Sequence, residues 1–178
     1  MSANRPAQTV WLTGLSGAGK TTLALAVERE LLRLSLPTCV LDGDELRRGL
    51  SSDLGLSRRD RAEQARRVAC VAGLISRSGV VAVVALVSPY AEDRRRARVI
   101  HEELRVPFLE VWVDTPLAVC EERDAKGLYA RARSGELSGL TGVDAPYEAP
   151  KAPALRVPGY GEAPENVAQE IVELLTRS

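Results

Sequence analysis

One run of residues, Gly14-Leu15-Ser16-Gly17-Ala18-Gly19-Lys20-Thr21, constrains the fold of this chain more than any other feature. It fits the phosphate-loop pattern G-x-x-x-x-G-K-[ST] without a mismatch. An apolar stretch at 10–12 precedes the run, and apolar residues follow it at helical spacing, at positions 23, 27, 31 and 34. The sequence therefore predicts a strand, a phosphate-binding loop and a helix in succession. A glycine-rich turn that only caps a helix is the alternative, which this context disfavours.

In such a loop, backbone N–H groups and the positive end of the helix dipole surround a polyphosphate. Lys20 would reach the β- and γ-phosphates of the nucleotide, and the Thr21 hydroxyl would hold Mg²⁺. The residues that we expect to bind the nucleotide in this segment are Gly14, Ser16, Gly17, Ala18, Gly19, Lys20, Thr21 and Thr22.

Composition places the chain among soluble globular proteins. Its 178 residues are 45% hydrophobic and 27% charged, which predicts a single domain spanning 1–178. A formal net charge of zero disfavours nucleic-acid and membrane-surface partners. The longest apolar run, 80–87, is too short to span a bilayer, and the polar segment 1–8 lacks the apolar core of a signal peptide.

The three cysteines are scattered and form no C-x-x-C motif, so we expect reduced thiols and a cytoplasmic location. The single histidine, His101, has no cysteine partner nearby in the sequence. We expect it to be a solvated helix residue and predict no structural metal site.

Apolar strand patterns alternate with helical patterns along the chain. Strands are expected at Thr9–Thr13, Thr38–Leu41, Val80–Val87, Phe108–Val113 and Leu155–Val157. Helices are expected at Lys20–Leu34, Arg58–Ser76, Glu92–Leu104, Leu117–Arg123 and Glu165–Leu175. This alternation predicts an α/β fold of the phosphate-loop NTPase type, with a parallel β-sheet flanked by helices on both faces.

Polar motifs follow the expected strands, at the sheet edge where ligands of such folds bind. Asp42-Gly43-Asp44 follows the second strand, whereas the third strand ends at Ser88 without the acidic residue that often binds metal there. Asp42 could orient Mg²⁺, and Asp44 could accept a hydrogen bond from an attacking hydroxyl. An ordinary turn is the alternative for this motif.

The segment from about 124 to 158 is rich in glycine and proline and carries basic residues. A connection this long predicts a mobile lid over phosphates, with a solvated loop as the alternative. One of only three lysines in the chain, Lys126, lies in it, which hints at a phosphate contact. Arg47 and Arg61 would suit an anionic acceptor, whereas solvated side chains are expected for Arg94, Arg95, Arg96 and Arg98.

Further motifs follow the phosphate loop as far as about Pro150. They are Leu41-Asp42-Gly43-Asp44, Asp53-Leu54-Gly55, Ser88-Pro89-Tyr90, Val119-Cys120-Glu121-Glu122-Arg123-Asp124, Lys126-Gly127-Leu128-Tyr129 and Thr141-Gly142-Val143-Asp144-Ala145-Pro146-Tyr147-Glu148. Together these motifs resemble those of adenylylsulfate kinases, which phosphorylate the 3′-hydroxyl of adenosine 5′-phosphosulfate (APS). The last three motifs are specific to this family rather than to phosphate-loop proteins in general.

The resemblance implies a Mg²⁺-dependent kinase that uses ATP and forms a homodimer. It implies that Asp44 is the catalytic base and that Arg47 and Arg61 bind the phosphosulfate end of the acceptor. It also places Arg123 beside the adenine of ATP and Lys126 at the phosphates. Ser88 matches a serine that carries phosphate in some members. The expected catalytic residues are thus Lys20, Asp42, Asp44, Ser88 and Lys126, with Thr21 and Asp42 at the metal.

The chain departs from the family mainly in the acceptor half of the expected site. Glu45 and Gln64 replace asparagines, and Leu86 replaces a phenylalanine. Leu56 and Leu140 stand where the family has the aromatic rings that sandwich the acceptor adenine. The residues expected to bind the acceptor are Asp44, Arg47, Leu56, Arg61, Gln64, Leu86, Lys126 and Leu140.

Three functions stay open on the sequence. The first is phosphorylation of APS to 3′-phosphoadenosine 5′-phosphosulfate (PAPS). The second is a kinase of the same fold that acts on a different nucleotide-like anionic acceptor, which the leucines motivate. The third, a non-catalytic nucleotide-binding paralogue, is disfavoured because Lys20, Thr21, Asp42, Asp44 and Lys126 are all present.

Overall fold

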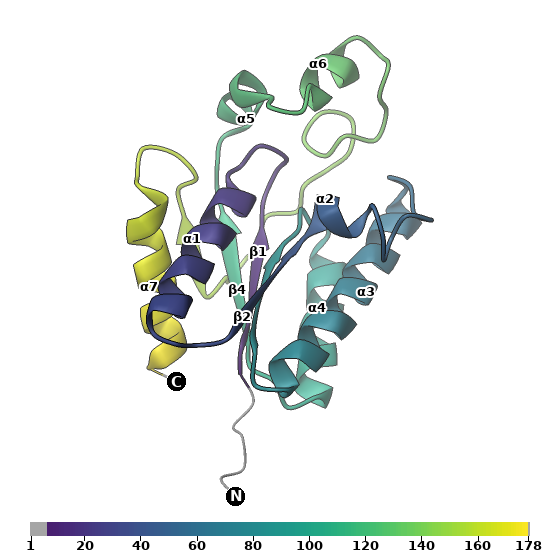
Figure 1. The fold of residues 1–178 in the computed structure, drawn as a ribbon. Helices are drawn as coiled ribbons and strands as arrows, with labels where there is room; N and C mark the ends of the chain where they lie inside the picture. The colour runs from purple at the N-terminus through teal and green to yellow at the C-terminus, as the bar shows by residue number, and fades with distance from the viewer. Residues whose placement is uncertain (1–6, 178) are drawn as a thin grey trace, which may run out of the picture.

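A single parallel β-sheet forms the centre of the molecule (Figure 1). The computed structural model describes residues 7–177, so most of the polar segment 1–8 lies outside the described residues. The strands run in the order β2-β3-β1-β4-β5, and each neighbouring pair is parallel. Their bounds are β1 Thr9–Thr13, β2 Thr38–Asp42, β3 Val81–Ala85, β4 Phe108–Val113 and β5 Leu155–Val157.

Helices cover both faces of this sheet, which confirms the predicted fold class (Figure 1). The helices are α1 Lys20–Arg33, α2 Gly43–Leu46, α3 Arg58–Arg77, α4 Ala91–Glu103, α5 Leu117–Arg123, α6 Leu128–Arg133 and α7 Pro164–Thr176. Side chains of a strand alternate between faces, so Val10 and Leu12 pack in the core under α1 and α7, while Trp11 packs in the core under α3 and α4.

Several boundaries differ from the sequence prediction. β3 is shorter than the apolar run 80–87, because its pairing with β1 and β2 ends at Ala85. α2 and α6 were not predicted. Each is short, and each begins where a carboxylate accepts from backbone N–H groups of its first turn, Asp42 for α2 and Asp124 for α6.

The prediction that His101 is solvated is wrong. Its side chain is fully buried, where Nε2 lies 3.0 Å from Thr9 Oγ1 and Nδ1 lies 2.7 Å from the Ala97 carbonyl oxygen. Burial lowers the pKa of His101, which favours the neutral ring. Charged residues dominate the sequence of α4, so its pattern does not indicate which side of the helix faces the sheet.

The prediction of solvation is also wrong for Arg94, which is 3% exposed and bonded to Glu110. Arg95 and Arg96 are exposed as expected and pair with Glu92 on their own helix. Arg98 is half-exposed and also reaches Glu110. Among residues 7–177, none of the helices is both long and apolar enough to cross a membrane.

Candidate active site

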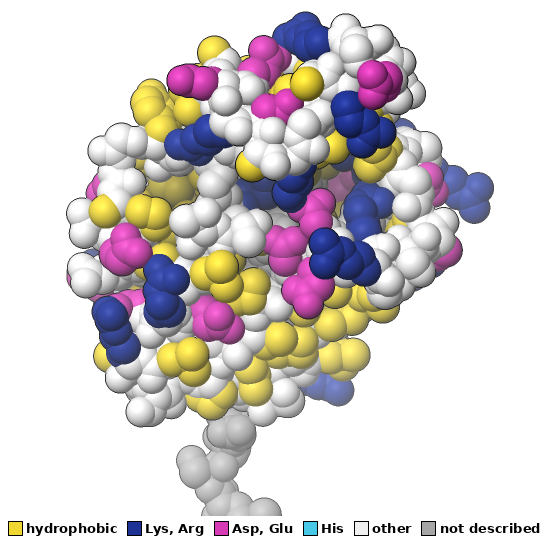
Figure 2. Space-filling model, turned by 45° about the horizontal axis from the view of Figure 1, so that its top comes forward, with side chains coloured by type: hydrophobic (Ala, Val, Ile, Leu, Met, Phe, Trp, Pro, Cys, Tyr) yellow, Lys and Arg dark blue, Asp and Glu magenta, His cyan; other side chains and the backbone are white. Residues whose placement is uncertain are grey.

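A cavity of about 850 Å³ opens at the carboxyl ends of the parallel strands. Its walls come from the phosphate loop and α1, the β2–α2 connection, α3, the end of β3, the segment 123–141 and the β5–α7 loop. Figure 2, turned toward this end of the molecule, shows acidic and basic side chains gathered around the hollow. The topology therefore brings together segments that lie more than a hundred residues apart.

The phosphate loop curls at the start of α1 as the sequence predicts. Gly17 and Gly19 take positive φ angles of 74° and 102°, which side chains disfavour. Lys20 Nζ donates to the Gly14 and Leu15 carbonyl oxygens at 3.0 and 2.7 Å. Burial, partly opposed by the charge of Asp44, lowers the pKa of Lys20 to about 8.

Six of the eight predicted phosphate-loop residues line the cavity, among them Ser16 and the exposed Thr22. Gly14 and Ala18 do not. Ala18 is fully buried beneath the loop, and a Cβ on Gly14 would lie 2.5 Å from the Val113 carbonyl oxygen. Their part in nucleotide binding stays a prediction, since such loops bind phosphate through backbone N–H groups.

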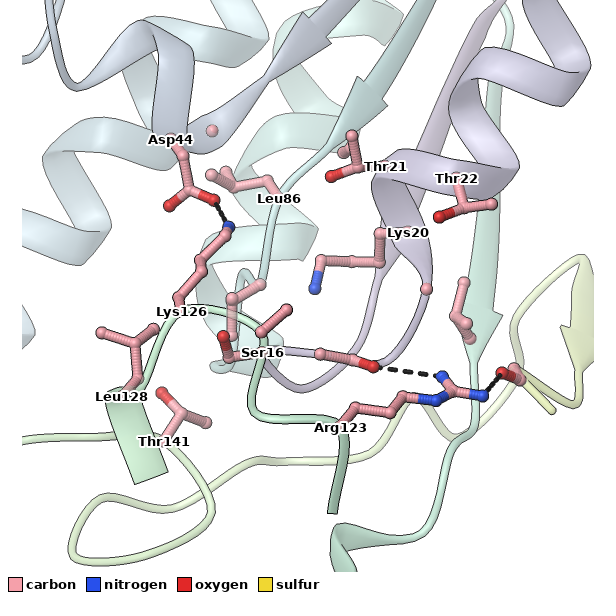
Figure 3. A pocket seen from close by; sticks show the side chains of 18 of the residues that line it. Ser16, Lys20, Thr21, Thr22, Asp44, Leu86, Arg123, Lys126, Leu128 and Thr141 are labelled. Carbon is pink, nitrogen blue, oxygen red and sulfur yellow. Dashed lines mark hydrogen bonds and ion pairs between the residues drawn. The ribbon is translucent and has the colours of Figure 1, made fainter. Parts of the chain in front are cut away.

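Side chains from later in the chain hold the phosphate loop in place. The Thr115 hydroxyl donates to the Ala18 carbonyl oxygen, and the Tyr129 hydroxyl donates to that of Ser16, each at 2.8 Å. Arg123 donates to the carbonyl oxygens of Gly17 at 3.2 Å and Gly159 at 2.8 Å (Figure 3). Three side chains from outside the phosphate loop thus hold its carbonyl oxygens.

The Asp42-Gly43-Asp44 motif is a helix start rather than a plain turn. Asp42 Oδ1 accepts from the backbone N–H groups of Asp44 and Glu45 at 2.9 and 3.3 Å, and so caps α2. Asp42 Oδ2 accepts from the Thr21 hydroxyl at 2.6 Å. Burial favours the neutral acid, but these hydrogen bonds outweigh it and lower the pKa of Asp42.

Asp44 and Lys126 meet across the cavity. Their side chains form an ion pair that joins α2 to the connection between α5 and α6 (Figure 3). Both side chains are more than half exposed, so the pair is open to solvent and to a ligand. The structure thus brings the predicted base and the predicted lid lysine to the same point.

Arg47 and Arg61 line the cavity on the side where the sequence predicts the acceptor, called the acceptor half below. Arg47 Nη1 donates to the Leu54 and Gly55 carbonyl oxygens at 3.2 and 3.0 Å. Arg61 donates to the carbonyl oxygens of Leu56 at 3.0 Å and Gly139 at 2.6 Å. Both arginines are partly buried, and this burial lowers the pKa of their guanidinium groups.

The predicted apolar wall of this half is also present. Leu56, Leu86 and Leu140 all line the cavity, with Leu140 buried and Leu56 36% exposed. Gln64 lines it as well, but its Nε2 donates to the Gly43 carbonyl oxygen at 3.0 Å. Gln64 therefore supports the D-G-D segment besides facing the cavity.

Ser88 lines the cavity at the end of β3, although its hydroxyl is engaged. Ser88 Oγ accepts from Trp11 Nε1 at 3.0 Å and donates to the Leu86 carbonyl oxygen at 3.3 Å. The residue is 3% exposed. Its role as a catalytic, phosphate-carrying serine stays a prediction.

Sequence reasoning named Thr141 within a motif but did not place it at the site. Thr141 lines the cavity, and its hydroxyl is buried with no hydrogen-bond partner among the described residues. Buried hydroxyls in folded proteins are nearly always bonded, so this one is a candidate contact for a ligand or a water molecule. No signal in a single sequence could have shown that its partner is missing.

The family model described as adenylylsulphate kinase matches residues 6–158. An adenylyl-sulfate kinase of Geotalea daltonii is 54% identical over 148 residues, which are 83% of this chain and 72% of the relative. The bifunctional enzyme CysN/CysC of Mycobacterium tuberculosis is 50% identical over 96% of this chain, which spans 28% of that relative. A solved structure of the M. tuberculosis APS kinase CysC in complex with AMPPNP and APS has a TM-score of 0.93 and 48% identity, covering 97% of this chain and 99% of that one.

Proposed function

Because this chain belongs to the adenylylsulphate kinase family, we propose that it transfers the γ-phosphoryl group of ATP to the 3′-hydroxyl of APS, giving PAPS and ADP. The enzyme class expected from the sequence, an adenylyl-sulfate kinase, is confirmed by the family. One observation carries the residue-level proposal: a complete phosphate loop, the Asp44–Lys126 pair and two acceptor-side arginines share one cavity.

The chemistry needs a base for the hydroxyl and positive charge around the moving group. Asp44 takes the proton of the acceptor 3′-hydroxyl as that oxygen forms a bond to the γ-phosphorus. The bond from the γ-phosphorus to the bridging oxygen breaks, and ADP leaves. Lys20 and Lys126 offset the negative charge on the phosphates, and Lys126 exchanges its contact with Asp44 for one with the phosphates.

Thr21 and Asp42 are the residues that would hold Mg²⁺ in this proposal. Their oxygens lie 2.6 Å apart beside the phosphate loop, and the lowered pKa keeps Asp42 ionised. Mg²⁺ prefers such oxygen ligands and keeps several waters, so a site with few protein ligands suits it. The described residues contain no cluster of three acidic, histidine or cysteine side chains for a metal. When bound, the ion would offset charge on the phosphates.

The acceptor would bind with its phosphosulfate end at Arg47 and Arg61 and its adenine among Leu56, Leu86 and Leu140. The guanidinium groups already bond to carbonyl oxygens of the cavity wall, so they are held ready for an anion. Arg123, next to Gly17 and Gly159, would contact the adenine of ATP.

A second function keeps the kinase and changes the acceptor to another nucleotide-like anion. The aliphatic wall favours it, because leucines exclude water without the stacking energy of aromatic rings. Replacing the partly exposed Leu56 by phenylalanine tests it. A rise in activity on APS would support an edited base pocket, and unchanged activity would count against one.

Assembly as a homodimer and location in the cytoplasm stay predictions. The dimer rests on resemblance alone, and the location rests on the three unpaired cysteines. Light scattering on the purified chain after size-exclusion chromatography would separate a monomer from a dimer and larger assemblies.

The direct test measures ADP release from ATP and Mg²⁺, with and without APS, and identifies the product by mass. We expect a large APS-dependent rate and PAPS as the product. Turnover that APS does not stimulate, with ATP binding intact, would reject APS as the acceptor and call for a panel of nucleotide anions. Absence of turnover on every acceptor, with ATP still bound, would favour the non-catalytic paralogue.

A further inference from the structure

A buried cluster of polar groups lies directly behind the acceptor half of the cavity, and the proposed chemistry does not use it. Its centre is Arg94 near the start of α4, whose side chain is 3% exposed. Arg94 Nε donates to Glu110 Oε1 at 2.8 Å, which compensates the buried charge. Glu110 Oε2 in turn accepts from Arg98 at 3.1 Å. Since removing a guanidinium from water is costly, a buried arginine with full partners calls for a structural reason.

The remaining donors of Arg94 join two separate segments of the chain. Nη1 donates to the Ser88 carbonyl oxygen at 2.8 Å, and Nη2 donates to the Glu148 carbonyl oxygen at 2.6 Å. Ser88 lies in the β3–α4 connection and lines the cavity, and Glu148 lies near the end of the expected lid 124–158. The planar guanidinium of Arg94 thus binds the segment 124–158, called the lid segment below, to the β3–α4 connection.

Further bonds fix the same point of the lid segment. The Glu148 backbone N–H donates to the Pro89 carbonyl oxygen at 2.8 Å, and its carboxylate accepts from the Ala91 backbone N–H at 2.8 Å. The Tyr147 hydroxyl lies 3.0 Å from the hydroxyl oxygen of Thr13, which directly precedes the phosphate loop. We call Arg94, Tyr147 and Glu148, with their partners, the lid anchor.

A compact turn connects the lid anchor to the cavity wall. The backbone N–H groups of Val143, Asp144 and Ala145 all donate to the Leu140 carbonyl oxygen. The Asp144 carboxylate accepts from the Gly139 backbone N–H at 2.6 Å. On the far side of this turn, Arg61 binds the Gly139 carbonyl oxygen. The wall at Leu140 is therefore held at both ends by an arginine.

We propose that Arg94 is a positioning residue for the acceptor, which sets where Leu140 and Thr141 stand by fixing the lid segment at Glu148. This inference rests on the proposed function, since it assigns the wall to acceptor binding. Arg94 itself does not line the cavity and touches no reacting atom. Losing it should weaken acceptor binding while leaving the donor half, held by Thr115, Tyr129 and Arg123, intact.

The test compares Arg94→Lys and Arg94→Met with Arg95→Met, a matched control on the same helix. Within residues 7–177, the Arg95 side chain pairs with Glu92 alone. Lysine keeps the charge opposite Glu110, so this variant should fold, yet it cannot bond both carbonyl oxygens. We expect the KM for APS to rise about tenfold in Arg94→Lys and more in Arg94→Met, with ATP affinity within about twofold of the wild type. Arg95→Met should match the wild type.

Amide hydrogen exchange supplies a readout that does not depend on activity. In Arg94→Lys, the amides of Glu148 and Ala91 should exchange faster, because their bonds belong to the lid anchor, while amides in α1 keep their protection. Equal KM values for the lysine variant and the control, or loss of ATP and acceptor binding together, would overturn the proposal. If the wild type fails to use APS, the proposed function fails, and the exchange data still test the lid anchor.

Discussion

The two halves of the cavity are built by different means. The donor half is a contiguous loop, curled by glycines and held from behind by bonds to its carbonyl oxygens from Thr115, Tyr129 and Arg123. The acceptor half is assembled from side chains of α2, α3, the end of β3 and the lid segment, segments that meet only in the folded chain. Backbone shape thus defines one half, and the relative placement of elements defines the other.

This difference separates what each half can tolerate. The backbone conformation of the first half is set within one short segment, although distant side chains support it, whereas the second half depends on every contact that positions its several segments. The departures from the family expected from the sequence fall mainly in the second half, at Glu45, Leu56, Gln64, Leu86 and Leu140. Substitutions should therefore divide into those that affect acceptor binding alone and those that stop the chemistry.

The largest effect is expected at the boundary of the two halves. Asp44→Asn keeps the shape of the side chain and removes the proposed base, so kcat should fall by about 10²- to 10⁴-fold. ATP affinity should stay near that of the wild type, because the phosphate loop is untouched. Rapid-mix product formation and calorimetric ATP titration measure the two quantities. Loss of ATP binding together with the fall in kcat would contradict the separation of the two halves of the cavity.

Arg61→Met should produce the next largest effect. The change removes a charged donor to Leu56 and Gly139 and a positive charge at the acceptor, so the KM for APS should rise about ten- to a hundredfold. Arg59→Met, an exposed arginine on the same helix, is the matched control and should leave this KM unchanged. Steady-state kinetics with varied APS measure both, and a fall in ATP affinity would contradict the separation of halves.

Thr141→Val sharpens the comparison at one atom. If the acceptor supplies the partner that this buried hydroxyl lacks among the described residues, its removal should raise the KM for APS roughly five- to tenfold. Stability should be equal to that of the wild type or slightly higher, measured as a thermal midpoint. Ser51→Ala removes the other unpaired buried hydroxyl among the described residues, which does not line the cavity, and should not change the KM.

The smallest effect concerns pH in the donor half. The pKa of Lys20 is lowered to about 8, so the free protein loses this positive charge as the pH rises through that value. ATP binds the protonated form, so its affinity should fall severalfold between about pH 7.5 and about pH 9. A guanidinium at this position would remain charged, so in Lys20→Arg this dependence should disappear even though binding is weaker. A flat profile in the wild type would contradict the assignment.

Sequence reasoning predicted the donor half and the sheet well, because both depend on local patterns. The loop motif, the apolar strands and the helical spacing at α1 and α3 each lie within a short window, and the structure places them as expected. Sequence reasoning also placed Ser88 and Lys126 at the correct end of the sheet, because the residues that follow parallel strands lie at the same end.

The residues that sequence reasoning misjudged depend on contacts between distant segments. His101 and Arg94 lie on a helix whose composition suggests solvent, yet they face Thr9 and Glu110, which come from strands elsewhere in the chain. Within the phosphate loop, the packing of Gly14 against Val113 and the bond from Thr115 to the Ala18 carbonyl oxygen likewise join distant segments. The spacing of polar and apolar residues indicates how polar each face of a helix is, but it does not indicate which residues of other segments pack against that face.

The strand order has a consequence for how the chain folds. β1 is made early, but it stands in the middle of the sheet between β3 and β4. One of its edges therefore stays open until synthesis has passed Val113, and open strand edges invite pairing with other chains. Pairing over such long separations is slow. The phosphate loop, which follows β1, therefore gains the neighbouring strand β4 late. Aggregation should be most frequent in the incomplete chain that has not yet reached β4.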